Sequence, residues 1–136
     1  KDQKITVSVI PQLLKSKKEQ IFSLSGISNS KTIDCNESGY YSIYQSDRYG
    51  FNNPDKEWDQ IEVEYLLVGD SYVQGNCVNR PNDISSVLRY LSNKPVVNIA
   101  YKAMGPLMEY SALREYSNFK VNKFAIIPDI FAHRFK

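Results

Sequence analysis

The clearest hydrophobic pattern in the chain begins at residue 61. Ile61, Val63 and Tyr65 alternate with polar residues, and the next three positions are all apolar. A continuous apolar run is typical of a strand that is buried on both faces of a parallel sheet. The pattern therefore predicts a strand over 61–68, which ends at Gly69-Asp70-Ser71.

A helical pattern follows this strand. Asn82 and Asp83 are suitable N-cap residues, and the apolar positions after them recur at the spacing of one helix face. These positions are Ile84, Val87, Leu88 and Leu91. Asn93-Lys94-Pro95 ends the predicted helix, because proline cannot continue it.

Three more elements complete the pattern. Residues 96–99 are predicted to form a short strand, and 124–127 a third one. Between them, Gly105-Pro106 begins a helix that runs to about Tyr116, since proline suits the first turn of a helix. Strands that alternate with helices predict an α/β fold with a parallel sheet and helices on both faces.

Residues 1–59 have a different character. They are rich in Ser, Asn, Asp, Gly, Lys and Tyr and contain several turn signals. Alternating apolar positions predict one strand within 4–10, and a second is predicted around 40–44. Six aromatic residues argue against disorder; they are Tyr40, Tyr41, Tyr44, Tyr49, Phe51 and Trp58. We interpret 1–59 as an N-terminal extension packed on a domain formed by 60–136.

Composition narrows the possible functions. A length of 136 residues suits one domain, and a net charge of +2 is too small to indicate nucleic-acid binding. The one basic cluster, residues 15–18, is interpreted as a solvated surface. No apolar run approaches the roughly 20 residues that a membrane-spanning helix needs, so no membrane span is predicted in this chain.

Two cysteines, Cys35 and Cys77, are present. Neither belongs to a CxxC motif or to a Cys/His cluster, so no metal site and no cofactor is indicated. Free buried thiols are the default expectation, and a disulfide is the alternative, because pairing depends on a compartment that the sequence does not reveal. The chain starts at Lys1 without a methionine or a signal-like segment, which suggests a fragment or a processed product.

Ser71 is the candidate nucleophile. Ligands bind at the carboxyl ends of the strands in open α/β sheets, and Ser71 directly follows the predicted central strand. Gly69 permits a sharp turn, Asp70 can accept hydrogen bonds from backbone amides of that turn, and Gly75 allows a second close approach. The N–H of Ser71 would lie near a developing oxyanion. On these features alone, a helix-initiating turn is the alternative interpretation.

Three segments resemble the SGNH (GDSL) hydrolase family, bacterial type. Residues 65–75, with Gly-Asp-Ser followed by an aromatic residue and a glycine, resemble its first sequence block. Residues 46–54 resemble a Gly-Phe-Asn-Asn-Pro segment that precedes this block, and 98–106 resemble the second block. The resemblance covers roughly residues 21–120, the N-terminal portion of the family's domain.

The resemblance implies a three-layer α/β/α sandwich with a parallel, flavodoxin-like sheet, here incomplete. It implies an esterase or carbohydrate O-acetylesterase that acts on a small-molecule or carbohydrate ester, with Ser71 as nucleophile and oxyanion donor. The second oxyanion N–H falls on Ala103, where the family has glycine, with Gly105 as the alternative. Asn79 and Arg80 lie where they could contact substrate.

Two family elements are missing from the expected places. No Gly-x-Asn segment follows the third predicted strand, and no Asp-x-x-His pair is present. His133, the only histidine, stands four residues after Asp129 and is not expected to be the base. We therefore expect that the chain is truncated before that pair. The alternatives are an O-acyltransferase that uses the same serine, and a non-catalytic or degenerate member.

Overall fold

The structure is a computed structural model that describes residues 5–8, 13–15, 20–37 and 39–127. Its centre is a three-stranded parallel sheet in the order β7-β6-β8. β6 (Glu62–Gly69) lies between β7 (Val96–Asn98) and β8 (Lys120–Ile127). Leu66 of β6 lies opposite Val97 on one side and opposite Phe124 on the other. The buried apolar run of β6 is therefore explained by its central position.

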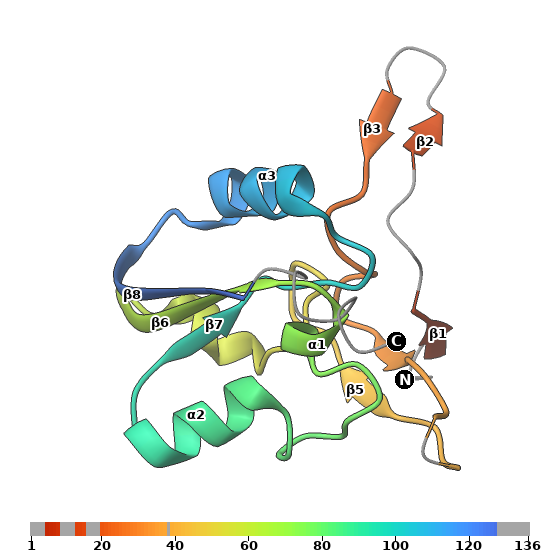
Figure 1. Ribbon diagram of the computed structural model, residues 1–136, viewed down its shortest axis with the longest axis horizontal. Helices are drawn as coiled ribbons and strands as arrows, with labels where there is room; N and C mark the ends of the chain where they lie inside the picture. Colours follow the sequence, from red (N-terminus) through yellow and green to blue (C-terminus); the bar gives the residue numbers. More distant parts are fainter. Residues whose placement is uncertain (1–4, 9–12, 16–19, 38, 128–136) are drawn as a thin grey trace.

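Two helices lie on opposite faces of this sheet, α3 (Pro106–Tyr116) above and α2 (Ile84–Ser92) below in Figure 1. The carboxylate of Asp83 accepts from the N–H of Ser86 (3.0 Å) and caps α2, and Asn93 ends that helix in the left-handed conformation (φ +52°). The chain is thus a mixed α/β protein built on a small parallel sheet.

Each face of the sheet has its own hydrophobic core. On the α3 side, Leu66, Val68 and Ile99 pack with Met104 and Ala112. On the α2 side, a smaller buried group packs against the partly buried Ile84 and Leu88 of α2; its members are Leu67, Val73, Val96 and Ala100. Successive side chains of a strand point to opposite faces, so Leu66 and Leu67 serve different cores.

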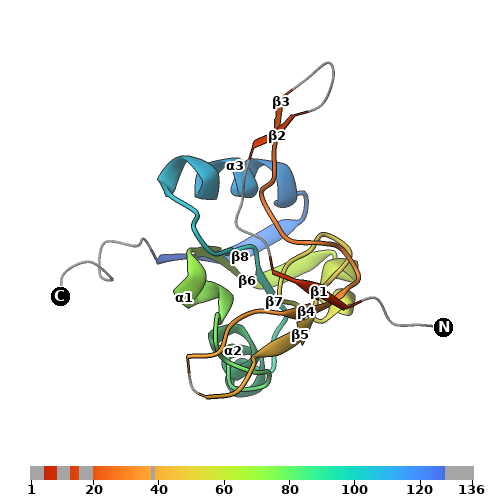
Figure 2. The same ribbon diagram turned by 90° about the vertical axis from the view of Figure 1, so that its right-hand side faces the viewer.

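The N-terminal part contains more regular structure than the sequence predicted. β1 (Ile5–Val7), β4 (Lys31–Ile33) and β5 (Ile43–Gln45) form a second small sheet. β2 (Leu13–Lys15) and β3 (Gln20–Phe22) form an antiparallel pair, which projects past α3 in Figures 1 and 2. A 3-10 helix, η1 (Asp55–Asp59), leads into β6.

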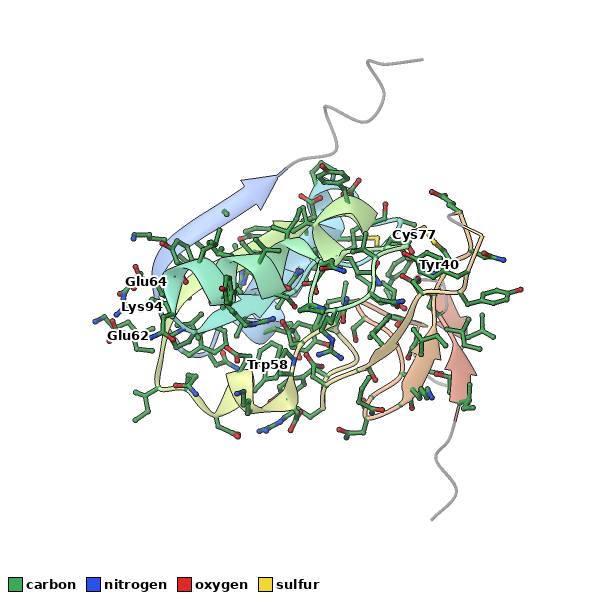
Figure 3. All side chains as sticks on the ribbon, turned by 90° about the horizontal axis from the view of Figure 1, so that it is seen from below. Tyr40, Trp58, Glu62, Glu64, Cys77 and Lys94 are labelled. Carbon is green, nitrogen blue, oxygen red and sulfur yellow. A yellow bond between two sulfur atoms is a disulfide. The ribbon has the colours of Figure 1, made fainter. Side chains whose placement is uncertain are left out.

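The expectation of free thiols was wrong: Cys35 and Cys77 form a disulfide, with their Cα atoms 5.1 Å apart. Cys35 follows β4, and Cys77 follows the turn after β6. The fold brings these segments together although 42 positions separate them in sequence, and spacing alone cannot predict such a meeting. Figure 3 shows Cys77 far from Glu62, which lies at the start of β6.

The predicted elements of the second half are confirmed, with small shifts at their ends. β6 and α3 agree with the prediction to within about one residue, and β8 begins four residues earlier than the predicted 124–127. Its additional residues are mostly polar and exposed at the sheet edge, so they carry no apolar signal. No helix within the described ranges is long and apolar enough to cross a membrane.

Candidate functional site

Ser71 begins a one-turn helix, α1 (Ser71–Gln74), at the carboxyl end of β6. Asp70 caps this turn, because its carboxylate accepts from the N–H of Tyr72 at 2.9 Å. The prediction that Asp70 stabilises the turn is therefore confirmed. Ser71 is half-buried and Tyr72 beside it is exposed, so the serine lies at the edge of the core and not within it.

The topology of the sheet predicts a ligand-binding crevice next to Ser71. β6 is joined through α2 to β7 on one side, and β7 is joined through α3 to β8 on the other side of β6. The two connections run in opposite directions, so a crevice is expected where they diverge, at the carboxyl ends of β6 and β8. Ser71 lies two residues beyond that end of β6.

Gly75 ends α1 in a conformation that few other residues adopt. Its φ is +82°, and a Cβ added there would lie 2.7 Å from the Cβ of Asp83. The N–H of Gly75 donates to the carbonyl of Tyr72 (3.2 Å) and closes the turn. The sequence-based expectation of a close approach at Gly75 is confirmed.

Buried amide side chains hold the far end of α1. Asn98, at the end of β7, donates from Nδ2 to the carbonyl of Val73 at 2.7 Å. Asn52 donates to the carbonyl of Gln74 at 3.1 Å. Both asparagines are at most 3% exposed. Because α1 has a single turn, these two bonds fix its orientation, and with it the position of Ser71.

The loop after β7 lies against the same turn. The N–H of Lys102 donates to Oε1 of Gln74 at 2.7 Å, and the N–H of Tyr101 donates to the carbonyl of Gly69 at 3.3 Å. Asn98 accepts from the N–H of Ala100 at 2.9 Å. The two segments that the sequence analysis singled out, around Ser71 and around Ala103, are therefore in direct contact.

Ala103 has a left-handed backbone, with φ +59°. Its backbone is thus not ordinary, and it adopts the conformation that glycine would favour. Gly105 has φ −107°, and a Cβ added there would meet nothing within 4 Å. The backbone at this position therefore does not require glycine, and Gly105 is the N-cap residue of α3.

Two backbone donors remain available at this place. Across the described residues, the N–H groups of Ser71 and Ala103 donate no hydrogen bond, and the Ser71 hydroxyl has no partner. Such N–H groups could stabilise a negatively charged oxygen.

Lys102 ties the Ala103 loop to the small N-terminal sheet. Its ammonium forms an ion pair with Asp34 (3.3 Å) and contacts the hydroxyl of Ser8. The Asp34 side chain is 2% exposed, so this ion pair is shielded from water. The loop next to Ser71 is thus held from two sides, by Gln74 of α1 and by Asp34.

Asn79 and Arg80 contact β5. Oδ1 of Asn79 accepts from the N–H of Ile43 at 2.8 Å, and Nη2 of Arg80 donates to the carbonyl of Gln45 at 2.6 Å. Burial lowers the pKa of the Arg80 guanidinium. These contacts hold the loop after α1 on the small sheet, and contact with a substrate stays a prediction for both residues.

A buried carboxylate lies behind the site. Asp47 is fully buried and accepts from the N–H groups of Tyr49 and Phe51, each at 2.9 Å. It also accepts from Nδ2 of Asn53 (2.9 Å) and from the indole N–H of Trp58 (2.7 Å). Burial raises the pKa of Asp47, and these four donors oppose that rise because they favour the ionised form.

Asn53 joins this carboxylate to β7. Its Nδ2 also donates to the carbonyl of Asn98 (2.8 Å), and its Oδ1 accepts from the N–H of Asn98 (2.9 Å) and from Arg89 (2.8 Å). A chain of hydrogen bonds therefore runs from Asp47 through Asn53 to Asn98, and from there to α1. The sequence indicates a turn and a family motif at Asn52-Asn53-Pro54, but it carries no signal of this buried role of Asn53.

No metal site is apparent here, since no group of three His, Cys, Asp or Glu side chains within the described ranges is arranged to hold an ion. His133 lies outside the described residues. Comparisons of the chain with protein-family models, with curated proteins and with solved structures found no match. The function is therefore inferred from the geometry around Ser71.

Proposed function

We propose that this chain is a serine ester hydrolase of the SGNH type, with Ser71 as the acyl-accepting nucleophile. The observation that carries the proposal is the place of Ser71 at the switch point of the sheet, in a turn fixed by Asn98 and Asn52. The order β7-β6-β8 supports it further, because a doubly wound sheet of order 2-1-3-4-5 begins in this way. A three-layer α/β/α sandwich is the corresponding fold proposal.

The proposed reaction uses the groups described above. The hydroxyl oxygen of Ser71 attacks the carbonyl carbon of an ester, and a base takes the hydroxyl proton. The N–H groups of Ser71 and Ala103 stabilise the oxyanion, the alcohol leaves with a proton, and water then releases the acid from the acyl-enzyme. The described residues contain no histidine, so the proposal assigns the base to a group outside them. The substrate class is a small-molecule or carbohydrate ester.

A fluorophosphonate probe tests the nucleophile directly. In a protein that includes the residues proposed to supply the base, we expect covalent labelling that peptide mapping assigns to Ser71, and that is lost in Ser71→Ala. Ser111→Ala is the matched control, because this serine lies on α3 and bonds only within its own helix, so its loss should leave labelling unchanged. Labelling of other serines without Ser71, in a protein shown to be folded by circular dichroism, would contradict the proposal and favour a non-catalytic role.

A further inference from the structure

A cavity lies at the end of β6 opposite to Ser71. Its volume is about 450 Å³, within the range of small-molecule sites. Gln60 and Ile61 line it just before β6, and Asn118 and Phe119 line it just before β8. It is therefore at the amino ends of the parallel strands. Figure 3 shows Trp58, another lining residue, well away from Cys77.

Aromatic rings form most of the apolar wall. Tyr49, Trp58, Tyr116 and Phe119 all line the cavity. The rings are steeply inclined to one another: Tyr49 and Trp58 lie at 71° with centroids 4.6 Å apart, and Trp58 and Phe119 lie at 63° with centroids 5.8 Å apart. Tyr116 packs against Trp58 at 61°. The electron-rich faces of such rings attract cations.

The charged groups in the cavity lining and directly behind it are acidic. Glu115 belongs to the lining, and none of the described lining residues is a lysine or an arginine. Behind the wall, the buried carboxylate of Asp47 accepts the indole N–H of Trp58 at 2.7 Å. Burial raises the pKa of Tyr116, and the charges of Glu115 and Asp47 raise it further. The carboxylates of Glu115 and Asp47 therefore favour positive charge in the cavity.

Three basic residues directly adjoin lining residues in sequence: Arg114, Lys120 and Arg48. Arg114 and Lys120 are exposed, and Arg48 is held by two carboxylates. Its guanidinium binds Asp55 and Asp59, each at 2.8 Å, on the exposed side of η1. Gln60 and Asn118 add neutral amide groups at the rim, which could bind a hydroxyl or an amine substituent of a ligand.

We propose that this cavity binds a small organic ammonium ion, such as a quaternary amine. The aromatic rings would contact the cationic head and Glu115 would balance its charge. A neutral sugar would use the same rings and amides but would gain nothing from the carboxylates, and an aliphatic ligand would leave Glu115 unused. The site is separate from Ser71 and does not depend on the proposed hydrolase activity.

Trp58, the only tryptophan in the sequence, provides the readout. Choline and tetramethylammonium chloride are titrated while Trp58 fluorescence is followed, with sodium chloride as the ionic-strength control. The neutral isostere 3,3-dimethylbutan-1-ol tests whether charge matters. We expect saturable changes with both cations and at least about tenfold weaker binding of the neutral isostere, as the size of a cation–π interaction implies.

Variants assign the effect to the cavity. Glu115→Gln, on an exposed side chain, should weaken choline binding several-fold without affecting folding, and Tyr49→Leu should weaken it about tenfold. Tyr90→Leu, on the outer face of α2, and Ser71→Ala should leave binding unchanged. The proposal is overturned if choline gives no saturable change. It is also overturned if the neutral isostere or a methyl glycoside binds as tightly, or if Glu115→Gln binds as tightly as the unchanged chain.

Discussion

At the scale of single residues, Ala103 is the most unusual feature of the candidate site. An L-residue in the left-handed region costs roughly 1–2 kcal/mol, and Ala103 has φ +59°. The neighbouring contact from the N–H of Lys102 to Gln74 (2.7 Å) helps to hold the loop in this conformation. Strained backbone of this kind is often found at functional sites, and here it occurs at a residue whose N–H donates no hydrogen bond within the described part of the chain.

Substitution of Ala103 tests this strain. Ala103→Gly should raise the free energy of unfolding by about 0.5–1 kcal/mol, because glycine relieves the strain but adds freedom to the unfolded chain.

Gly75→Ala tests the opposite change, from glycine to an L-residue at a left-handed position. With φ +82° and an added Cβ only 2.7 Å from the Cβ of Asp83, this substitution should lower stability by more than about 1 kcal/mol. Urea unfolding measures both, and a destabilised Ala103→Gly variant would contradict the strain.

Sequence could predict the residues of the Ser71 turn but not the ones that hold it. Ser71, Asp70 and Gly75 are close in sequence, so local turn chemistry was sufficient to assign them. Asn53 and Asn98 are 45 positions apart, and an asparagine in a loop carries no signal of a buried partner. Their hydrogen bonds become visible only when the strands are placed.

At the scale of elements, strong periodicity predicted well, whereas the short strands β2, β3 and β4 were not predicted. The apolar positions of α2 and the continuous run of β6 gave both elements correctly. β4, which pairs with β5, has only three residues, too few for a pattern of period two to stand out. The inner side of that sheet includes Thr32 and Tyr44, both buried, so it lacks the usual apolar face.

The disulfide compensates for the small size of these strands. In the chain-entropy description, a cross-link over a separation of 42 residues stabilises the folded state by about 4 kcal/mol. Replacing both cysteines by serine should therefore lower the free energy of unfolding by about 3–4 kcal/mol, as measured by urea unfolding. Cys35→Ser alone and Cys77→Ser alone should each have a similar effect. A double variant as stable as the original chain would show that the pair is not formed in solution.

At the scale of the whole molecule, residues 1–59 and 60–136 share one interior. Phe51 is fully buried in the core that also contains Leu66 and Ile99 of the parallel sheet. Asp47 and Asn53 are also buried, and their hydrogen bonds join the N-terminal part to β7 of the parallel sheet. The extension is therefore part of the structure that supports Ser71, which composition alone did not reveal because this segment resembles a series of turns.

The pH dependence of stability should show the role of Asp47. Its pKa is raised in the folded chain, so its ionisation favours the unfolded state. Its contribution to stability is greatest below the ordinary pKa of an aspartate, near 3.8, and decreases as pH rises through the raised value.

Asp47→Asn removes this titration and turns an amide donor toward Asn53 and Trp58, which are donors themselves. We expect a loss of about 1–3 kcal/mol from the unsatisfied groups, and a difference from the original chain that becomes smaller as pH rises. Urea unfolding at several pH values measures it. A difference that grows with pH would contradict the raised pKa.

The length of β6 also sets the distance between the two proposed sites. Its eight residues span about 26 Å at 3.3 Å per residue, with the aromatic cavity at one end and Ser71 at the other. A small choline ester could not place its ammonium in the cavity while its carbonyl reached the serine. The two sites would therefore be occupied independently, and only a polymer or a long-chain molecule bearing both groups could connect them.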